Sequence, residues 1–305
     1  MEGERKPVVD ISVLTPSLNY GRFIEDALLS THAQPDRNLV FEHIVQDGQS
    51  SDETIAMLSS FDGDLDWSSE ADLGQSDALN RALARAEGRW IAWLNADEFF
   101  IPGGLAQLVR VGERTDTDVV YGDCVIIDED GRFVRLQPQH HFSRRVLSEY
   151  GCFIASSSVV FRRSVLGEAP WDVGIRRVMD WDLFLRLADN GAAFRHVPFP
   201  VGAFRLHPAQ VTSSPWHEWI EEDASVASRH GQPPDHLVRW GRYRVARRWH
   251  RFYKLMEGAY LRELRARAFL GKDIRWFHSE EGQANTSALL RRCYGRKSAE
   301  VGREP

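Results

Sequence analysis

The sequence predicts an α/β fold with a mostly parallel central sheet flanked by helices, followed by a helical C-terminal extension. Before residue 100, short apolar runs typical of buried strands alternate with segments whose apolar residues recur at helical spacing. The connections between them are short, which favours helices that return the chain to one end of a parallel sheet. From about Trp216 onward the pattern is helical and basic. We therefore expect a sheet domain at residues 1–215 and an extension at residues 216–305.

The first half of the sheet domain alternates between strands and helices. Phe23, Ala27 and Leu28 recur at helical spacing and mark the inward face of the first helix. Ser50 and Glu53 resemble a capping box that opens the second helix. The predicted elements, in order, are strand 8–14, helix 22–31, strand 41–46, helix 50–60, strand 66–70, helix 76–86 and strand 90–94.

The second half of the sheet domain contains a predicted hairpin. Asp128-Glu129-Asp130-Gly131 is typical of a turn between two antiparallel strands. Later, Trp181, Phe184 and Leu185 give a helix with one apolar face. The predicted elements, in order, are helix 105–111, strand 118–127, strand 132–136, strand 156–161, helix 180–188 and an extended segment at 194–206.

Composition limits the class of protein. The chain has 305 residues, of which 43% are hydrophobic and 27% are charged, so disorder and repeat or fibrous architectures are excluded. Its three cysteines, Cys124, Cys152 and Cys293, are too few and too far apart for a disulfide framework or a cysteine zinc site. We expect a cytoplasmic protein, because neither a signal peptide nor a spanning apolar run is visible.

Charge is divided unequally along the chain. The residues from Trp216 onward carry 18 Lys and Arg and 12 Asp and Glu, whereas the preceding residues carry 20 and 32. A sheet domain with this acidic balance is not expected to bind nucleic acid. It suits a site that handles cations or neutral polyols.

Polar residues follow the predicted parallel strands where each strand ends. They are Asn19, Asp47, Asp72 and Asp97. Ligands of open α/β sheets bind beyond the carboxyl ends of the strands, so these side chains are expected to converge on one site. Each is also an ordinary turn or cap residue, which is the alternative for any one of them taken alone.

Five blocks of sequence occur in order between residues 8 and 213. They are Thr15-Pro16-Ser17-Leu18-Asn19, residues 43–52, residues 69–98, Met179-Asp180-Trp181-Asp182-Leu183 and Phe204-Arg205-Leu206-His207. Together they resemble the family 2 glycosyltransferases, which are inverting enzymes of the GT-A fold. The resemblance implies an enzyme that moves a sugar from a nucleotide-diphosphate donor to a hydroxyl acceptor (a sugar, glycolipid or small molecule), in polysaccharide or glycoconjugate synthesis. It does not reach the extension.

The resemblance also implies a metal site. Asn95-Ala96-Asp97 stands where the family has an Asp-x-Asp motif, so Asp97 is expected to bind Mn²⁺ or Mg²⁺. His207 matches a histidine that completes this site, although it could instead cap the end of a strand. A divalent cation would neutralise the diphosphate and its developing charge. Asn95 could bind the ribose or a metal-bound water.

The remaining matches concern the donor and the catalytic base. The resemblance implies a donor of the UDP or dTDP type, with Asp47 accepting from the base, and it makes Asp180 the general base that takes the acceptor proton. Asp77 could instead cap its helix. The residues expected at the donor are Thr15, Pro16, Asn19, Asp47, Asp72, Asp77, Asn95 and Ala96.

Three other functions are considered. A sugar-nucleotide pyrophosphorylase would need a glycine-rich loop with a catalytic cation after the first strand, where this chain has Thr15 to Asn19. A glycoside hydrolase would leave the nucleotide-type strand ends unexplained. A catalytically degenerate relative that serves as a binding or scaffold subunit is the main alternative, and its only support is the non-acidic Asn95.

The extension contains a basic helix with an apolar stripe. Val245, Trp249, Phe252, Met256 and Tyr260 fall at helical spacing, and most of the arginines lie off that stripe. Such a helix can lie on an anionic membrane, which would place the enzyme on the inner membrane face. It can also pack its stripe onto the sheet domain, which is the interpretation we favour, or support oligomerisation.

Overall fold

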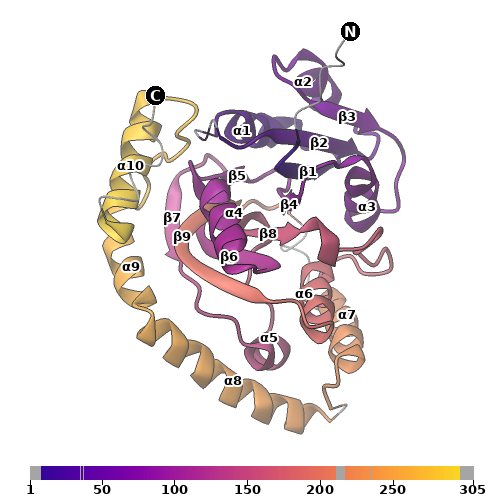
Figure 1. Ribbon diagram of the computed structural model, residues 1–305, viewed down its shortest axis with the longest axis vertical. Coiled ribbons are helices and arrows are strands. Elements are labelled where there is room, and N and C mark those ends of the chain that lie inside the picture. The colour runs from indigo at the N-terminus through magenta and orange to yellow at the C-terminus, as the bar shows by residue number, and fades with distance from the viewer. Residues whose placement is uncertain (1–7, 35, 37, 211–216, 234, 296–305) are drawn as a thin grey trace.

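The computed structural model describes residues 8–34, 36, 38–210, 217–233 and 235–295 (Figure 1). Its strands are β1 Ile11–Ser17, β2 Phe41–Asp47, β3 Asp66–Ser69, β4 Trp90–Trp93, β5 Phe99–Phe100, β6 Val119–Ile127, β7 Phe133–Gln137, β8 Val159–Arg162 and β9 Phe194–Arg205. Its α-helices are α1 Gly21–His32, α2 Thr54–Ser60, α3 Gln75–Arg85, α4 Gly104–Thr115, α5 Arg144–Tyr150, α6 Met179–Asp189, α7 His217–Arg229, α8 His236–Met256, α9 Ala259–Ala266 and α10 Glu280–Tyr294.

The strands of the described residues form a single mixed sheet in the order β3-β2-β1-β4-β8-β6-β9-β5, with β7 paired to β6. The first four strands of this order are parallel to one another, as predicted. Strand β8 then enters antiparallel between β4 and β6, and β6 is again parallel to β9. The carboxyl ends of β1, β2, β3 and β4 therefore meet at one edge, where the predicted polar residues lie.

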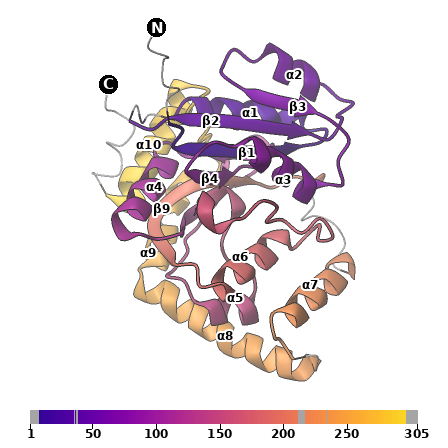
Figure 2. The same ribbon diagram turned by 45° about the vertical axis from the view of Figure 1, so that its right-hand side comes forward.

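Both faces of the sheet are covered, which confirms the α/β architecture. One large hydrophobic cluster joins the sheet to α1 and α4, and a second joins it to α3, α5 and α6. The clusters also include extension residues, such as Leu289 and Leu290 of α10 on the first face and Val226 and Ala227 of α7 on the second. The extension thus contributes to the core, and Figures 1 and 2 show it as an arc around the sheet domain.

The predicted elements are present, with three differences. Neither β5 nor α5 was predicted, and the predicted strand 156–161 begins with a 3₁₀ turn at Ser156–Ser158. The capping box is wrong, because α2 begins at Thr54 and the Glu53 side chain makes no capping hydrogen bond. Asp52 accepts from the Thr54 amide instead, at 3.0 Å. Ser50 instead contacts Asn19, in the loop after β1, and Asp47, at the end of β2.

The expectation that the apolar stripe of α8 packs onto the sheet domain is also wrong. Helix α8 packs against α5 through other residues, and its buried residues are Ala246 and His250. The His250 ring stacks on Tyr150 with 4.3 Å between ring centroids. Trp249 and Phe252 remain exposed. None of the described helices is long and apolar enough to cross a membrane.

A buried polar network joins the extension to the centre of the sheet. Asp123 of β6 is fully buried, and its carboxylate lies 2.9 Å from His196 Nε2 and 3.1 Å from Arg262 Nε, and accepts from the Tyr294 hydroxyl at 2.8 Å. The other ring nitrogen of His196, Nδ1, lies 2.9 Å from Glu257 Oε2. Burial opposes protonation of His196, but the bonds to Asp123 and Glu257 outweigh it and raise the pKa of the ring.

The variant Asp123→Asn should lower the free energy of unfolding by about 3 kcal/mol, because it leaves the Arg262 guanidinium buried without its counter-charge. Urea unfolding followed by circular dichroism measures the change. The matched control is Glu129→Gln, which breaks an exposed pair with Arg22 and should cost less than about 1 kcal/mol. Equal losses in the two variants would show that the network does not anchor the extension.

Candidate active site

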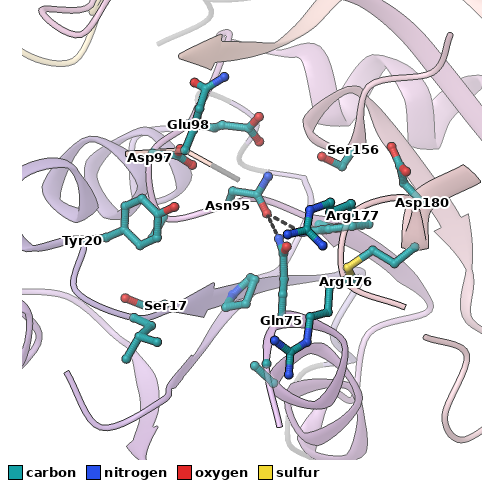
Figure 3. A pocket seen from close by; sticks show the side chains of 18 of the residues that line it. Ser17, Tyr20, Gln75, Asn95, Asp97, Glu98, Ser156, Arg176, Arg177 and Asp180 are labelled. Carbon is teal, nitrogen blue, oxygen red and sulfur yellow. Dashed lines mark hydrogen bonds between the residues drawn. The ribbon is translucent and has the colours of Figure 1, made fainter. Parts of the chain in front are cut away.

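A cavity of about 320 Å³ opens at the carboxyl ends of β1 and β4 (Figure 3). Its walls are the loop after β1, the start of α3, the loop after β4 and the segment that leads into α6. The predicted site residues that line it are Pro16, Asp72, Asn95, Ala96, Asp97 and Asp180. Thr15, Asn19, Asp47 and Asp77 do not line it. His207 lies behind it, against Asp97.

Asp97 and His207 form a buried polar pair at the site. His207 Nε2 lies 2.9 Å from Asp97 Oδ2, and both residues are buried. The histidine ring packs against Phe23, with 4.7 Å between ring centroids, and Tyr20 meets it edge-on. The pairing therefore brings together two residues 110 positions apart, and their aromatic surroundings hold the imidazole in place.

Arg205 positions the backbone that carries Asp97. It is buried, and its Nε donates to the Asp97 carbonyl at 2.8 Å. The same guanidinium pairs with Asp26 of α1, whose other carboxylate oxygen lies 2.7 Å from His278 Nε2 in the extension. The loop after β4 is therefore fixed from both the sheet domain and the extension.

Glu98 adds a second acidic group beside Asp97. Its carboxylate is buried and makes no hydrogen bond of normal geometry with the described residues. Burial, and then the charge of Asp97, raise the pKa of Glu98 well above its usual range. The same causes raise the pKa of the Tyr20 hydroxyl, which also lines the cavity. Glu98 therefore holds a proton more readily than an ordinary glutamate does.

Asn95 is oriented by two donors. Its Oδ1 accepts from Gln75 Nε2 and from Trp93 Nε1, both at 2.7 Å (Figure 3). The amide oxygen is thus occupied, and the amide nitrogen is the group of Asn95 that can donate to a ligand. Asn95 is suited to hydrogen bonding a polar substrate group and is poorly suited to binding a metal directly.

Asp180 lies at the start of α6, on a different side of the cavity from Asp97 (Figure 3). Burial raises the pKa of its carboxyl, against the hydrogen bond that the Trp181 amide donates to Oδ1 at 2.7 Å. A carboxylate with a raised pKa is a better proton acceptor. Asp182, two residues on, is buried and pairs with Arg186 at 2.7 Å, so it supports the helix.

Asp72 and Asp77, which lie close together at the start of α3, make different contacts. Asp72 lines the cavity and accepts from the Gly74 amide at 2.9 Å, where Gly74 has φ 114°, a conformation that favours glycine. Burial raises the pKa of Asp72. Asp77 accepts from the Leu73 amide and pairs with Arg81 at 2.8 Å. These contacts agree with the capping alternative for Asp77.

Asp47 is held at the end of β2, outside the cavity. Its carboxylate is fully buried and accepts from the Ser50 amide at 2.9 Å, from the Ser50 hydroxyl, and from the Ser69 hydroxyl at 2.7 Å. These bonds tie the end of β2 to its own loop and to β3. Contact between Asp47 and a nucleobase would require a rearrangement of the Ser50 loop.

The other two predicted residues also support the strand ends. Thr15 is buried, and its hydroxyl lies 2.8 Å from His43 Nε2. Asn19 has φ 59°, which asparagine tolerates better than most residues. The backbone amide of Asn19 donates to the Ser50 hydroxyl, and its side-chain Oδ1 accepts from the backbone amide of Ser51. Asn19 thereby joins the loops that follow β1 and β2.

Sequence reasoning missed two arginines. Arg176 and Arg177 line the cavity from the segment before α6 (Figure 3). Glu222 of α7 accepts from both of their backbone amides, at 3.0 and 2.7 Å, so the extension holds this segment. The sequence does show these two adjacent arginines shortly before Asp180, and they could have been predicted to line the site on that ground. The cavity is therefore acidic near Asp97 and basic on this side.

The residues at Asp97 fit a divalent cation in part. One carboxylate oxygen and one imidazole nitrogen are directed at each other, and this donor set suits Mn²⁺ better than Mg²⁺. No group of three or more His, Cys, Asp or Glu residues that could hold a metal occurs among the described residues. Asp97 and His207 would therefore hold the ion together with oxygen atoms from a substrate.

Two solved structures with this architecture hold nucleotide sugars. S. aureus TarS in complex with UDP-GlcNAc matches with a TM-score of 0.60 at 15% identity, over 96% of this chain and 84% of that one. The mannosyltransferase PcManGT of Pyrobaculum calidifontis, in complex with GDP-Man and Mn²⁺, matches with a TM-score of 0.55 at 16% identity, over 99% and 77% of the two chains. The fold is therefore that of the GT-A glycosyltransferases.

Sequence comparison identifies the family within this fold. The sequence model described as "Glycosyl transferase family 2" matches residues 12–184, and the chain belongs to this family of glycosyltransferases, which use nucleotide sugars. A PGL/p-HBAD biosynthesis glycosyltransferase of Mycobacterium bovis is 28% identical over 59% of this chain and 70% of its own length. The Escherichia coli UDP-Glc:alpha-D-GlcNAc-diphosphoundecaprenol beta-1,3-glucosyltransferase WfgD is also 28% identical, over 68% and 81%.

Proposed function

We propose that this chain is a metal-dependent inverting glycosyltransferase with a UDP- or dTDP-type sugar donor. The observation that carries the proposal is that Asp97, paired with His207, and Asp180 reach one cavity from separate elements. When bound, Mn²⁺ or Mg²⁺ would neutralise the diphosphate of the donor. Asn95 and Asp72 would contact the nucleoside or sugar. The finer choice of donor is supported by the TarS complex with UDP-GlcNAc and by the name of the E. coli relative.

Asp180 would act as the general base. Its carboxylate would take the proton of the acceptor hydroxyl while the hydroxyl oxygen attacks the anomeric carbon. The bond from that carbon to the diphosphate oxygen breaks, and its electron pair leaves with the nucleotide. Attack from the face opposite the leaving group inverts the anomeric configuration.

The acceptor is proposed to be a hydroxyl group on a glycolipid or polysaccharide precursor. The M. bovis relative is named for PGL/p-HBAD biosynthesis, and the E. coli relative acts on a diphosphoundecaprenol-linked sugar. We also propose that residues 1–215 carry the catalytic groups, whereas residues 216–305 support them, through contacts such as that of Glu222 with the segment before α6.

Calorimetric titration of UDP into the full chain tests the proposal. We expect UDP to bind, and to bind more tightly with Mn²⁺ present. Asp97 and His207 alone give the ion too few ligands, so the diphosphate of UDP would supply others. GDP under the same conditions is the control for base selectivity. Binding of UDP that is independent of metal would overturn the metal dependence. Absence of any nucleotide binding would favour the degenerate scaffold alternative.

A further inference from the structure

The exposed face of α8 combines apolar side chains with cations. Its apolar stripe consists of Val245, Trp249, Phe252 and Met256, and the exposed fractions of the last three are 44%, 47% and 68%. Exposed apolar residues continue beyond the helix, at Tyr260, Leu261 and Leu264 of α9. A soluble surface rarely shows so many large apolar side chains in one stretch, which marks an interaction surface.

The cations of this face have few counter-charges. The sequence of α8 contains six arginines and one lysine and no carboxylate. Arg239 pairs with Asp223 at 2.8 Å. Among the described residues, no carboxylate lies within salt-bridge distance of the other exposed arginines of α8, which are Arg242, Arg244, Arg247, Arg248 and Arg251. This face therefore favours binding to an anionic partner.

The position of the helix leaves the face accessible. The opposite side of α8 is already used, because Ala246 and His250 pack toward α5. Both views place α8 on the outer rim of the molecule (Figures 1 and 2). The stripe and the arginines thus point away from the sheet domain, and the active-site cavity includes no residue of α8.

A second copy of the chain is a poor occupant. In a two-fold symmetric dimer the same patch lies on both sides of the interface, so the arginines would face one another. Like charges brought together away from water are destabilising. A lipid surface satisfies both features at once, because apolar side chains enter the acyl boundary while cations contact phosphate headgroups.

We propose that the exposed face of α8, continued by α9, binds the anionic surface of a lipid bilayer. The helix lies in the plane of the interface, with Trp249, Phe252 and Met256 inserted between lipids and the arginines at the headgroups. This contact holds the enzyme at the membrane surface. It is independent of sugar transfer, because none of these residues contacts the active-site cavity.

Cosedimentation of the full chain with vesicles tests this inference. We expect binding to phosphatidylcholine vesicles that contain phosphatidylglycerol, weak binding to phosphatidylcholine alone, and loss of binding in high salt. Trp249→Ser combined with Phe252→Ser should lower the partition coefficient at least about tenfold. Arg248→Glu should lower it about 25-fold, because each elementary charge near such a surface contributes about fivefold.

The matched control is Arg114→Glu on α4, an exposed arginine whose replacement makes the same change in net charge. It should bind vesicles as the unmodified chain does, and circular dichroism should show all variants folded. Failure of the unmodified chain to bind anionic vesicles would overturn the inference, as would equal losses for Arg248→Glu and Arg114→Glu. A dimer that Trp249→Ser with Phe252→Ser converts to monomers would instead make this face a protein interface. No sugar nucleotide is present, so these results do not depend on the proposed activity.

Discussion

Asp180→Asn should lower kcat by a factor of about 100 to 10,000, the usual contribution of a general base. The asparagine cannot accept the acceptor proton, but it preserves the shape of the side chain, so UDP affinity should stay close to that of the unmodified enzyme. Single-turnover measurement of sugar transfer, together with calorimetric UDP titration, separates the two effects.

The pH dependence gives this prediction a second readout. The base must be ionised, so kcat should fall as the pH drops through the pKa of Asp180, which burial raises above the ordinary aspartate value. Asp182→Asn makes the same chemical change two residues further along α6, outside the cavity, and should keep most of its turnover. If Asp180→Asn transferred sugar at the original rate, the base would be another residue.

Asp97→Ala should weaken UDP binding in the presence of Mn²⁺ by on the order of 100-fold, because it removes the carboxylate proposed to hold the ion. Binding without metal should change little. The variant is expected to fold, since Arg205 contacts the backbone carbonyl of residue 97 rather than the carboxylate. Calorimetry with and without Mn²⁺ measures the difference.

His207→Ala should reduce the same metal-dependent affinity by about 10- to 100-fold. The control is Asp77→Asn, whose carboxylate is used by Leu73 and Arg81 outside the cavity, and which should leave UDP affinity unchanged. If metal-dependent binding persisted in both Asp97→Ala and His207→Ala, the metal would be held elsewhere.

The strand ends were predictable because they depend on local pattern and on a general property of parallel sheets. Buried runs followed by Asn95-Ala96-Asp97 and by Thr15-Pro16 place these residues at one edge, and the structure confirms that edge. The hydrogen-bond partners of each carboxylate were less predictable. Asp47 accepts a hydrogen bond from Ser50, three residues away, and a strand pattern does not reveal this contact.

Contacts between distant parts of the chain were beyond the sequence pattern. Asp123 interrupts an otherwise apolar strand, but its partners His196, Arg262 and Tyr294 follow 73 to 171 residues later. The stripe of α8 was misplaced for a related reason. Amphipathicity shows that a helix has two unlike faces, but only packing decides which face is covered, and here Ala246 and His250 are the covered residues.

The anchoring of Asp123 has a consequence for engineering. Because the extension follows the sheet domain in sequence, it could be taken for a segment that can be exchanged between relatives on its own. A chimera that received a foreign tail without partners equivalent to Arg262 and Tyr294 would leave the buried Asp123 carboxylate with only its partners in the sheet domain, such as His196. A successful exchange would have to replace Asp123 together with Arg262 and Tyr294.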